Sequence, residues 1–157
     1  MQFKECYQNP FIEERADPYI TLGPDGFYYF TASYPMKSAD DKDGYDRVIL
    51  RRAKDISELA SAEEITIWKV ADTTLTHRFI WAPELHYIAG RWYVFYAGSE
   101  DKENNWAFDC HVLVCDSDDP YTGTWSEKGK FQKREDDDFS FTGFSLDMTL
   151  KMVNALM

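Results

Sequence analysis

The chain has 157 residues, a formal net charge of −11, 44% hydrophobic residues and 17% aromatic residues. This composition is too apolar for a wholly disordered chain, and the length allows one domain with a real core. The negative charge, with no cluster of Lys or Arg to offset it, argues against nucleic acids and anionic membranes as partners.

The first part of the chain reads as a small antiparallel sheet. Tyr19–Leu22 and Phe27–Ser33 are rich in strand-forming residues, and the segment Gly23–Gly26 between them contains the Pro and Gly of a tight turn. Asp46–Arg52 and Ile65–Trp68 follow as two further extended runs. We therefore expect four strands here, the first two forming a hairpin.

The same series then starts again. Glu84–Ile88, a turn at Ala89–Gly90, Trp92–Tyr96 and His111–Cys115 repeat the first three strands, and Trp125 ends the second unit as Trp68 ends the first. A third copy opens at Asp147, 63 residues after Glu84 (147 − 84). The alignment pairs Asp17 with Glu84, Gly26 with Gly90, and Val48 with Val112.

Four-stranded units repeated at this interval are typical of the blades of a β-propeller. The predicted fold class is all-β, a partial propeller of about two blades plus the start of a third over residues 1–149. Residues 150–157 lose the strand alternation and read as an aberrant tail, as a frameshift or premature stop would produce. Uncovered blade edges predict self-association.

Three carboxylates, Asp17, Glu84 and Asp147, occupy matching places at the start of each copy. Innermost strands of a propeller converge on its axis, so we expect these groups to meet in one partly enclosed space. Hydrolysis of a glycosidic bond needs such a group of carboxyls, one to donate a proton and one to activate water.

The motifs Arg15–Ile20, Tyr45–Ala53, Ile80–Tyr87 and Phe144–Asp147, in this order and at blade spacing, resemble glycoside hydrolase family 43, and its α-L-arabinofuranosidase branch most. That family consists of five-bladed propeller enzymes acting on arabinose- and xylose-containing carbohydrates. The resemblance covers roughly residues 9–149 and implies an inverting, exo-acting hydrolase that releases L-arabinofuranose. β-Xylosides are the second substrate choice.

The resemblance also implies roles for the three carboxylates. Asp17 would be the general base that polarises water, and Asp147 would orient the acid and raise its pKa. Glu84 would contact the substrate. The bland alternatives are a turn Asp before Pro18 for Asp17 and a strand-edge Asp for Asp147. The family's general acid is a Glu in a later blade, and no position of this chain matches it, so we expect the chain alone to be nearly inactive.

Two further residues are candidate substrate contacts. Trp81 can stack on a sugar or pack between blades. His86 lies two residues after Glu84, on the same strand face, and can contact a sugar hydroxyl or be a packed core histidine. Trp106 reads as a structural or loop residue.

No cofactor is implied, and we predict no metal site: the three cysteines form no C-x-x-C pair, and the acidic stretches lack the spacing of a calcium loop. The odd number of cysteines and the absence of a basic segment followed by an apolar one predict a cytoplasmic setting. A noncatalytic carbohydrate-binding propeller and an interaction scaffold are the rival functions.

Overall fold

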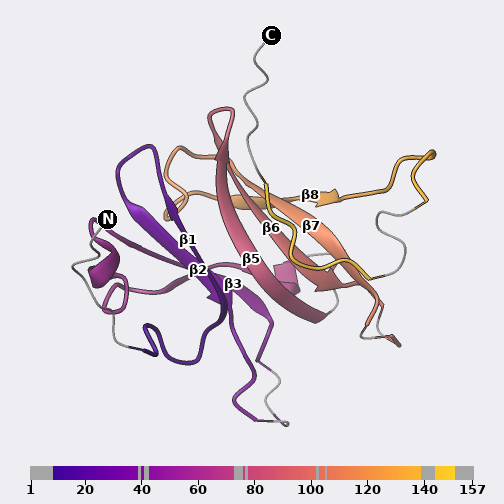
Figure 1. The fold of residues 1–157 in the computed structure, drawn as a ribbon, viewed down its shortest axis with the longest axis horizontal. Coiled ribbons are helices and arrows are strands. Elements are labelled where there is room, and N and C mark those ends of the chain that lie inside the picture. Colours follow the sequence, from indigo (N-terminus) through magenta and orange to yellow (C-terminus); the bar gives the residue numbers. More distant parts are fainter. Residues whose placement is uncertain are drawn as a thin grey trace, which may run out of the picture.

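The protein consists of two four-stranded antiparallel sheets in this computed structural model, which describes residues 9–38, 40, 43–72, 76, 78–101, 103–104, 106–138 and 144–150. Each sheet follows the chain order, as a propeller blade does (Figure 1). The first holds β1 (Ala16–Leu22), β2 (Tyr28–Ser33), β3 (Arg47–Ala53) and β4 (Ile65–Lys69). The second holds β5 (Arg78–Ile88), β6 (Arg91–Ser99), β7 (Phe108–Cys115) and β8 (Trp125–Lys130).

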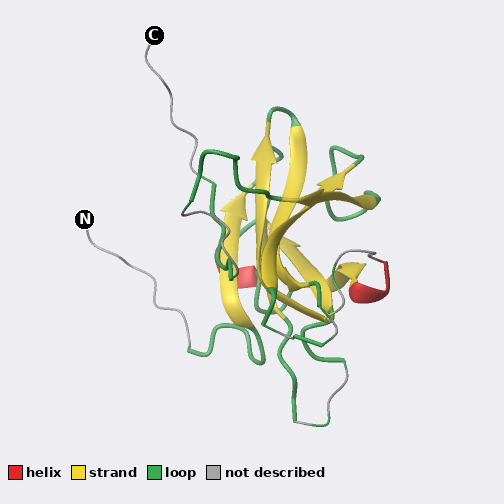
Figure 2. Cartoon of the chain, turned by 90° about the vertical axis from the view of Figure 1, so that its right-hand side faces the viewer, coloured by secondary structure: helices red, strands yellow, loops and turns green. Residues whose placement is uncertain are grey.

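Two short 3-10 helices, η1 (Ile56–Glu58) and η2 (Val70–Asp72), are the only helices in the described residues (Figure 2). The all-β prediction is therefore confirmed. In the same part of the chain, no helix is long and apolar enough to cross a lipid bilayer.

Both predicted hairpin turns are present at the expected glycines. The first is closed by hydrogen bonds from Gly23 N to Phe27 O and from Gly26 N to Gly23 O, 2.8 and 3.0 Å long, with Gly26 at φ +74°. At the second, Ala89 and Gly90 both have positive φ, the pattern of a two-residue type I′ turn whose twist suits a hairpin. The turns thus fix the two hairpins that begin the blades.

The strands of the second blade are longer than the sequence predicted. β5 begins at Arg78, before Pro83, because a β-bulge accommodates this residue, which cannot donate to the ladder. Trp125 begins β8 rather than ending the unit, and it pairs with Cys115, whereas Trp68 pairs with Val48. The expected equivalence of the two tryptophans is therefore wrong.

The main core lies between the two sheets. β5 packs against β1 and β2, and the buried side chains of this interface include Tyr29, Leu50, Leu85, Trp92 and Val94. Trp92 is fully buried, its ring meets Tyr29 edge-on at 5.1 Å, and its Nε1 donates to Asp118 O at 2.9 Å. Burial of these rings between the sheets is the main force that holds the blades together.

A charged clamp joins the blades at their outer side. Arg52 of β3 donates to both carboxylate oxygens of Asp119, at 2.9 and 3.0 Å, and its guanidinium lies 4.4 Å from the centre of the Tyr121 ring. The pKa of Asp119 is lowered because its hydrogen bonds from Tyr121 N, Arg52 and Thr122 outweigh the effect of burial. The clamp therefore fixes the relative position of the two sheets.

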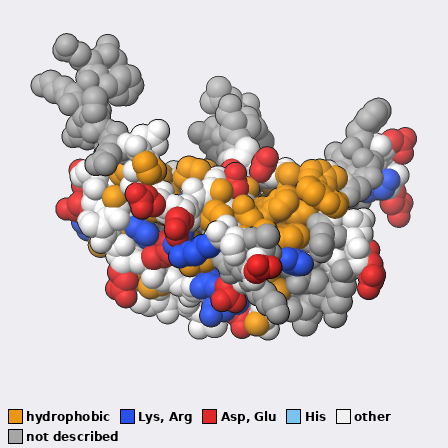
Figure 3. Space-filling model, turned by 90° about the horizontal axis from the view of Figure 1, so that it is seen from below, with side chains coloured by type: hydrophobic (Ala, Val, Ile, Leu, Met, Phe, Trp, Pro, Cys, Tyr) orange, Lys and Arg blue, Asp and Glu red, His pale blue; other side chains and the backbone are white. Residues whose placement is uncertain are grey.

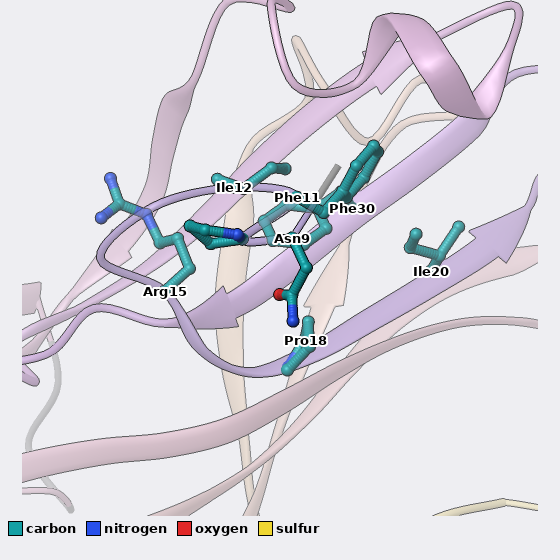
Figure 4. A pocket seen from close by; sticks show the side chains of 8 residues that line it. Asn9, Phe11, Ile12, Arg15, Pro18, Ile20 and Phe30 are labelled. Atoms are coloured by element: carbon teal, nitrogen blue, oxygen red, sulfur yellow. The ribbon is translucent and has the colours of Figure 1, made fainter. Parts of the chain in front are cut away.

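The outer face of the first blade carries a second core and an apolar cavity of about 450 Å³. Side chains of the segment before β1 and of β1 and β2 surround it (Figure 4). Ile20 and Leu22 of β1 are 38% and 59% exposed. The residues lining the cavity are Asn9, Pro10, Phe11, Ile12, Arg15, Pro18, Ile20 and Phe30.

Residues 144–150, the predicted start of a third copy, form no strand. Their attachment nevertheless repeats the way the second blade begins. Ser145 N donates to Phe108 O at 3.1 Å, beside the third strand of the second blade, as Ile80 N donates to Tyr45 O beside the third strand of the first. The predicted tail at 150–157 lies outside the described residues except for Leu150.

Candidate functional site

A β-bulge recurs at the start of each copy and places the candidate residues. The pairing of β1 with β2 shifts at residues 17–18, and that of β5 with β6 shifts at residues 82–83. Asp17, Ala82 and Asp147 all have positive φ, +50°, +44° and +54°, at an interval of 65 residues (82 − 17 and 147 − 82). Left-handed backbone at a non-glycine residue is strained and gathers at functional positions. The three copies therefore share one special position.

This geometry corrects the alignment made from sequence. The residue equivalent to Asp17 is Ala82, and Glu84 is equivalent to Tyr19, since Tyr19 pairs with Thr31 and Glu84 with Phe95 just after each bulge. The sequence offset was wrong by two residues because a bulge adds residues to one strand only. Only Asp17 and Asp147 carry a carboxylate at the shared position, and both are exposed.

Asp17 is tied to the second blade through Ser33. The Ser33 hydroxyl donates to Asp17 Oδ2 at 2.8 Å and accepts the Ala82 N–H at 2.8 Å. Ser33 is fully buried at the end of β2. The hydroxyl thus joins the special position of one blade to that of the next and orients the Asp17 carboxylate.

A second anchor lies just before Asp17. The carboxylate of Glu64 accepts hydrogen bonds from Arg15 Nε at 3.0 Å and from Arg51 Nε at 3.1 Å. Burial alone would raise the pKa of Glu64, but the two guanidinium groups hold it below its usual value. The start of β1 is therefore held to β3 by charge-assisted hydrogen bonds.

Glu84 and His86 form a pair beside Asp17, as their spacing predicted. His86 Nε2 lies 2.9 Å from Glu84 Oε2, and the His86 ring lies 5.3 Å from that of Tyr19. The pKa of Tyr19 is raised, first by burial and then by the negative charge of Glu84. The two inner strands therefore bring polar groups together on neighbouring blades.

Asp147 is placed beside β7. Burial raises the pKa of the Cys110 thiol, and the charges of Asp109 and Asp147 add to this effect. Among the hydrogen bonds of the described residues, none joins Asp147 to Asp17 or Glu84. The structure thus brings Asp17 and Glu84 onto adjoining strands, while Asp147 shares their backbone position without direct contact.

Trp81 belongs to an aromatic cluster at the end of the sheets where β1 and β5 begin, which we call the bottom (Figure 1). Its ring stacks on Phe108 at 4.2 Å and lies 5.5 Å from Phe79, and no described residue accepts its enclosed Nε1 proton. Trp106, taken from sequence as structural or loop, lies in a loop and is 66% exposed beside this cluster. Its exposure is not visible in the sequence, where it resembles any packed tryptophan.

No group of three or more His, Cys, Asp or Glu suited to a metal ion occurs in the part of the chain that the structure describes. The three sequence histidines include His77, which lies outside the described residues. His111 is fully buried in β7, and burial lowers its pKa.

Comparison with known proteins fits this arrangement. The model of glycosyl hydrolases family 43 matches residues 7–151. The chain belongs to family 43. The sequence resemblance is thereby confirmed, and the two sheets are blades of the family's propeller.

Relatives in the family are arabinofuranosidases by name. The chain is 40% identical over 150 residues to an extracellular exo-α-(1→5)-L-arabinofuranosidase of Streptomyces avermitilis, covering 96% of this chain and 28% of that protein. A Streptomyces chartreusis enzyme of the same name is 41% identical over 143 residues, with 91% and 39% covered. An α-L-arabinofuranosidase structure from Lactobacillus brevis has 36% identity and a TM-score of 0.76, with 94% and 44% covered. The chain thus spans less than half the length of these family 43 relatives.

The names of the two Streptomyces enzymes contradict the predicted cytoplasmic setting, which is wrong. The prediction used the cysteines, but these carry little information here. Cys110 and Cys115 are buried and free, and a propeller with a large apolar core needs no disulfides on either side of a membrane.

Proposed function

We propose that this chain supplies the general-base part of an inverting, exo-acting α-L-arabinofuranosidase, with Asp17 as the base. The observation that carries this proposal is the hydrogen-bonded relay from Asp17 through Ser33 to Ala82 N. It engages one carboxylate oxygen of Asp17, and the exposure of the side chain leaves the carboxylate open to a water molecule. An inverting hydrolase needs a fixed, ionised carboxylate beside the attacking water.

Asp147 is the residue that orients the acid and raises its pKa, and its backbone conformation, shared with Asp17, supports this role. Glu84, His86 and Trp81 contact the sugar from β5. The proton donor is not among the residues assigned in this chain, so the 157 residues alone have almost no turnover. Residues 1–149 are the blades of the catalytic domain, and 150–157 are the aberrant tail.

The substrate is an arabinose-containing oligo- or polysaccharide met outside the cell. The names of the Streptomyces and Lactobacillus brevis enzymes, at 36–41% identity, support arabinofuranosides as substrates and, for the Streptomyces pair, the extracellular setting. β-Xylosides are the competing substrates.

A chimera tests the proposal. Residues 9–149 replace the aligned part of the Lactobacillus brevis arabinofuranosidase, which supplies the remaining blades. We expect it to hydrolyse aryl α-L-arabinofuranoside at least about tenfold faster than aryl β-xyloside, a preference of about 1.4 kcal/mol in transition-state binding. A folded chimera that turns over neither substrate, or favours the xyloside, contradicts the proposal.

The proposal includes self-association of the isolated chain. Ile20 and Leu22 project from β1 beside the apolar cavity, and exposed apolar side chains on a sheet face favour association. Analytical ultracentrifugation of the purified chain should show a sedimentation coefficient that rises with concentration. A value that stays at the monomer's across the concentration range rejects this part.

A further inference from the structure

Two large aromatic side chains stand exposed at the bottom of the second blade. Trp106 is 66% exposed and Phe144 is 51% exposed, and their ring centres are 6.3 Å apart. Figure 3, which views the molecule from below, shows hydrophobic side chains gathered over part of this end. Single exposed apolar residues are ordinary, but adjoining rings from separate segments suggest a contact surface.

The surface is supported from beneath. Trp106 meets the ring of Trp81 edge-on at 6.3 Å, and Phe144 meets Phe108 edge-on at 5.6 Å. Phe108 in turn stacks on Trp81. The exposed rings therefore rest on a packed aromatic layer from β5 and β7, which limits their movement.

The loop that carries Trp106 is also held by hydrogen bonds. The Asn104 side chain accepts the Trp106 N–H at 3.1 Å, and Phe108 N donates to Trp106 O at 3.0 Å. Asn104 O accepts from Ala107 N at 3.1 Å and from Ser99 Oγ at 3.4 Å. An aromatic ring presented to water on a fixed backbone loses little entropy when it binds a ligand.

The surface lies close to the proposed base. Trp81 directly precedes Ala82, whose N–H ends the relay from Asp17. Trp106 lies outside Trp81, one ring further from Asp17. An exo-acting enzyme places only the terminal sugar next to the base, so a sugar on the outer ring belongs to the leaving group.

Charge narrows the ligand further. The loop carrying Trp106 also holds Glu100, Asp101 and Glu103, and of these Glu100 is paired with Lys130 at 2.7 Å. Carboxylates around an aromatic surface repel an anionic sugar such as a uronate. A neutral pentose keeps its apolar ring face available for stacking.

We propose that Trp106, with Phe144 beside it, is the stacking surface for the neutral pentose on the leaving-group side of the cleaved bond. This inference rests on the proposed arabinofuranosidase function. It assigns to the loop between β6 and β7 the selection of oligosaccharides over short glycosides.

Kinetics of the chimera test the inference with two substrates, α-1,5-linked arabinotriose and methyl α-L-arabinofuranoside, whose methyl leaving group has no ring to stack. Trp106→Ala should lower kcat/KM for arabinotriose about tenfold, which corresponds to about 1.4 kcal/mol, and leave the methyl glycoside within about twofold. Trp106→Phe should restore most of the loss. Tyr87→Ala, an aromatic that is 41% exposed at the other end of β5, is the matched control and should change neither substrate.

Binding to the 157-residue chain separates this inference from the proposed function. Among the five tryptophan indole N–H signals in the NMR spectrum, that of Trp106 is assigned by its loss in Trp106→Ala. It should shift when arabinotriose is added and stay unchanged with trigalacturonate. A shift without turnover by the chimera refutes the proposed function alone. An unmoved Trp106 signal, or equal losses on both substrates, overturns the stacking surface.

Discussion

Asp17→Asn in the chimera is expected to lower kcat for aryl α-L-arabinofuranoside by about 10²–10⁴-fold, the usual contribution of a general base. Asparagine keeps the shape of the side chain and an oxygen that accepts from Ser33, so the relay to Ala82 survives. What is lost is the ability to take a proton from water. Steady-state kinetics with an unchanged thermal midpoint would show that the loss is chemical.

Asp118→Asn is the control for this substitution. Asp118 is exposed in the loop between β7 and β8, away from the bulge at Asp17, and should keep wild-type turnover. If Asp17→Asn retains more than about a tenth of the activity, Asp17 is not the base.

Trp92→Ala is expected to destabilise the chain by about 3–5 kcal/mol, a large part of the stability of a typical domain. The side chain is fully buried between the blades, and its removal leaves a cavity against Tyr29 and an unpaired Asp118 carbonyl. Urea unfolding followed by circular dichroism measures the change.

Trp106→Ala serves as the comparison, because a ring that is 66% exposed contributes little to the core. It should shift the urea midpoint only slightly. A loss below about 1 kcal/mol for Trp92→Ala would mean that the two sheets do not depend on this interface.

Much of the fold follows from local sequence. Gly26 and Gly90 mark turns because glycine adopts positive φ without strain, and alternating apolar residues place Leu50 and Val94 in the interface between sheets. The pairing of Glu84 with His86 also follows from the two-residue period of a strand. Each of these features involves neighbours along the chain or a simple repeat.

The details of the site depend on features that periodicity does not report. The bulges at 17–18 and 82–83 insert residues into one strand and shift the alignment, so Glu84 was matched to the wrong position. The relay joins Ser33 to Ala82, which are 49 residues apart, and Ala82 takes part through its backbone N–H. No side-chain pattern identifies such a partner.

The exposure of Trp106 could not be predicted for a related reason. A tryptophan in an aromatic-rich chain is normally packed, and only the folded loop shows that this ring points to water. The cellular setting failed differently, since free cysteines are compatible with either compartment.

The most direct test of Asp17 as the base is rescue by azide in the chimera carrying Asp17→Gly. Glycine accepts the positive φ of this position and leaves room for the anion. If Asp17 activates water on the face opposite the leaving group, azide should restore hydrolysis of the aryl glycoside and give β-L-arabinofuranosyl azide, with inverted configuration by NMR. No rescue, or an azide product of retained α configuration, would contradict the account.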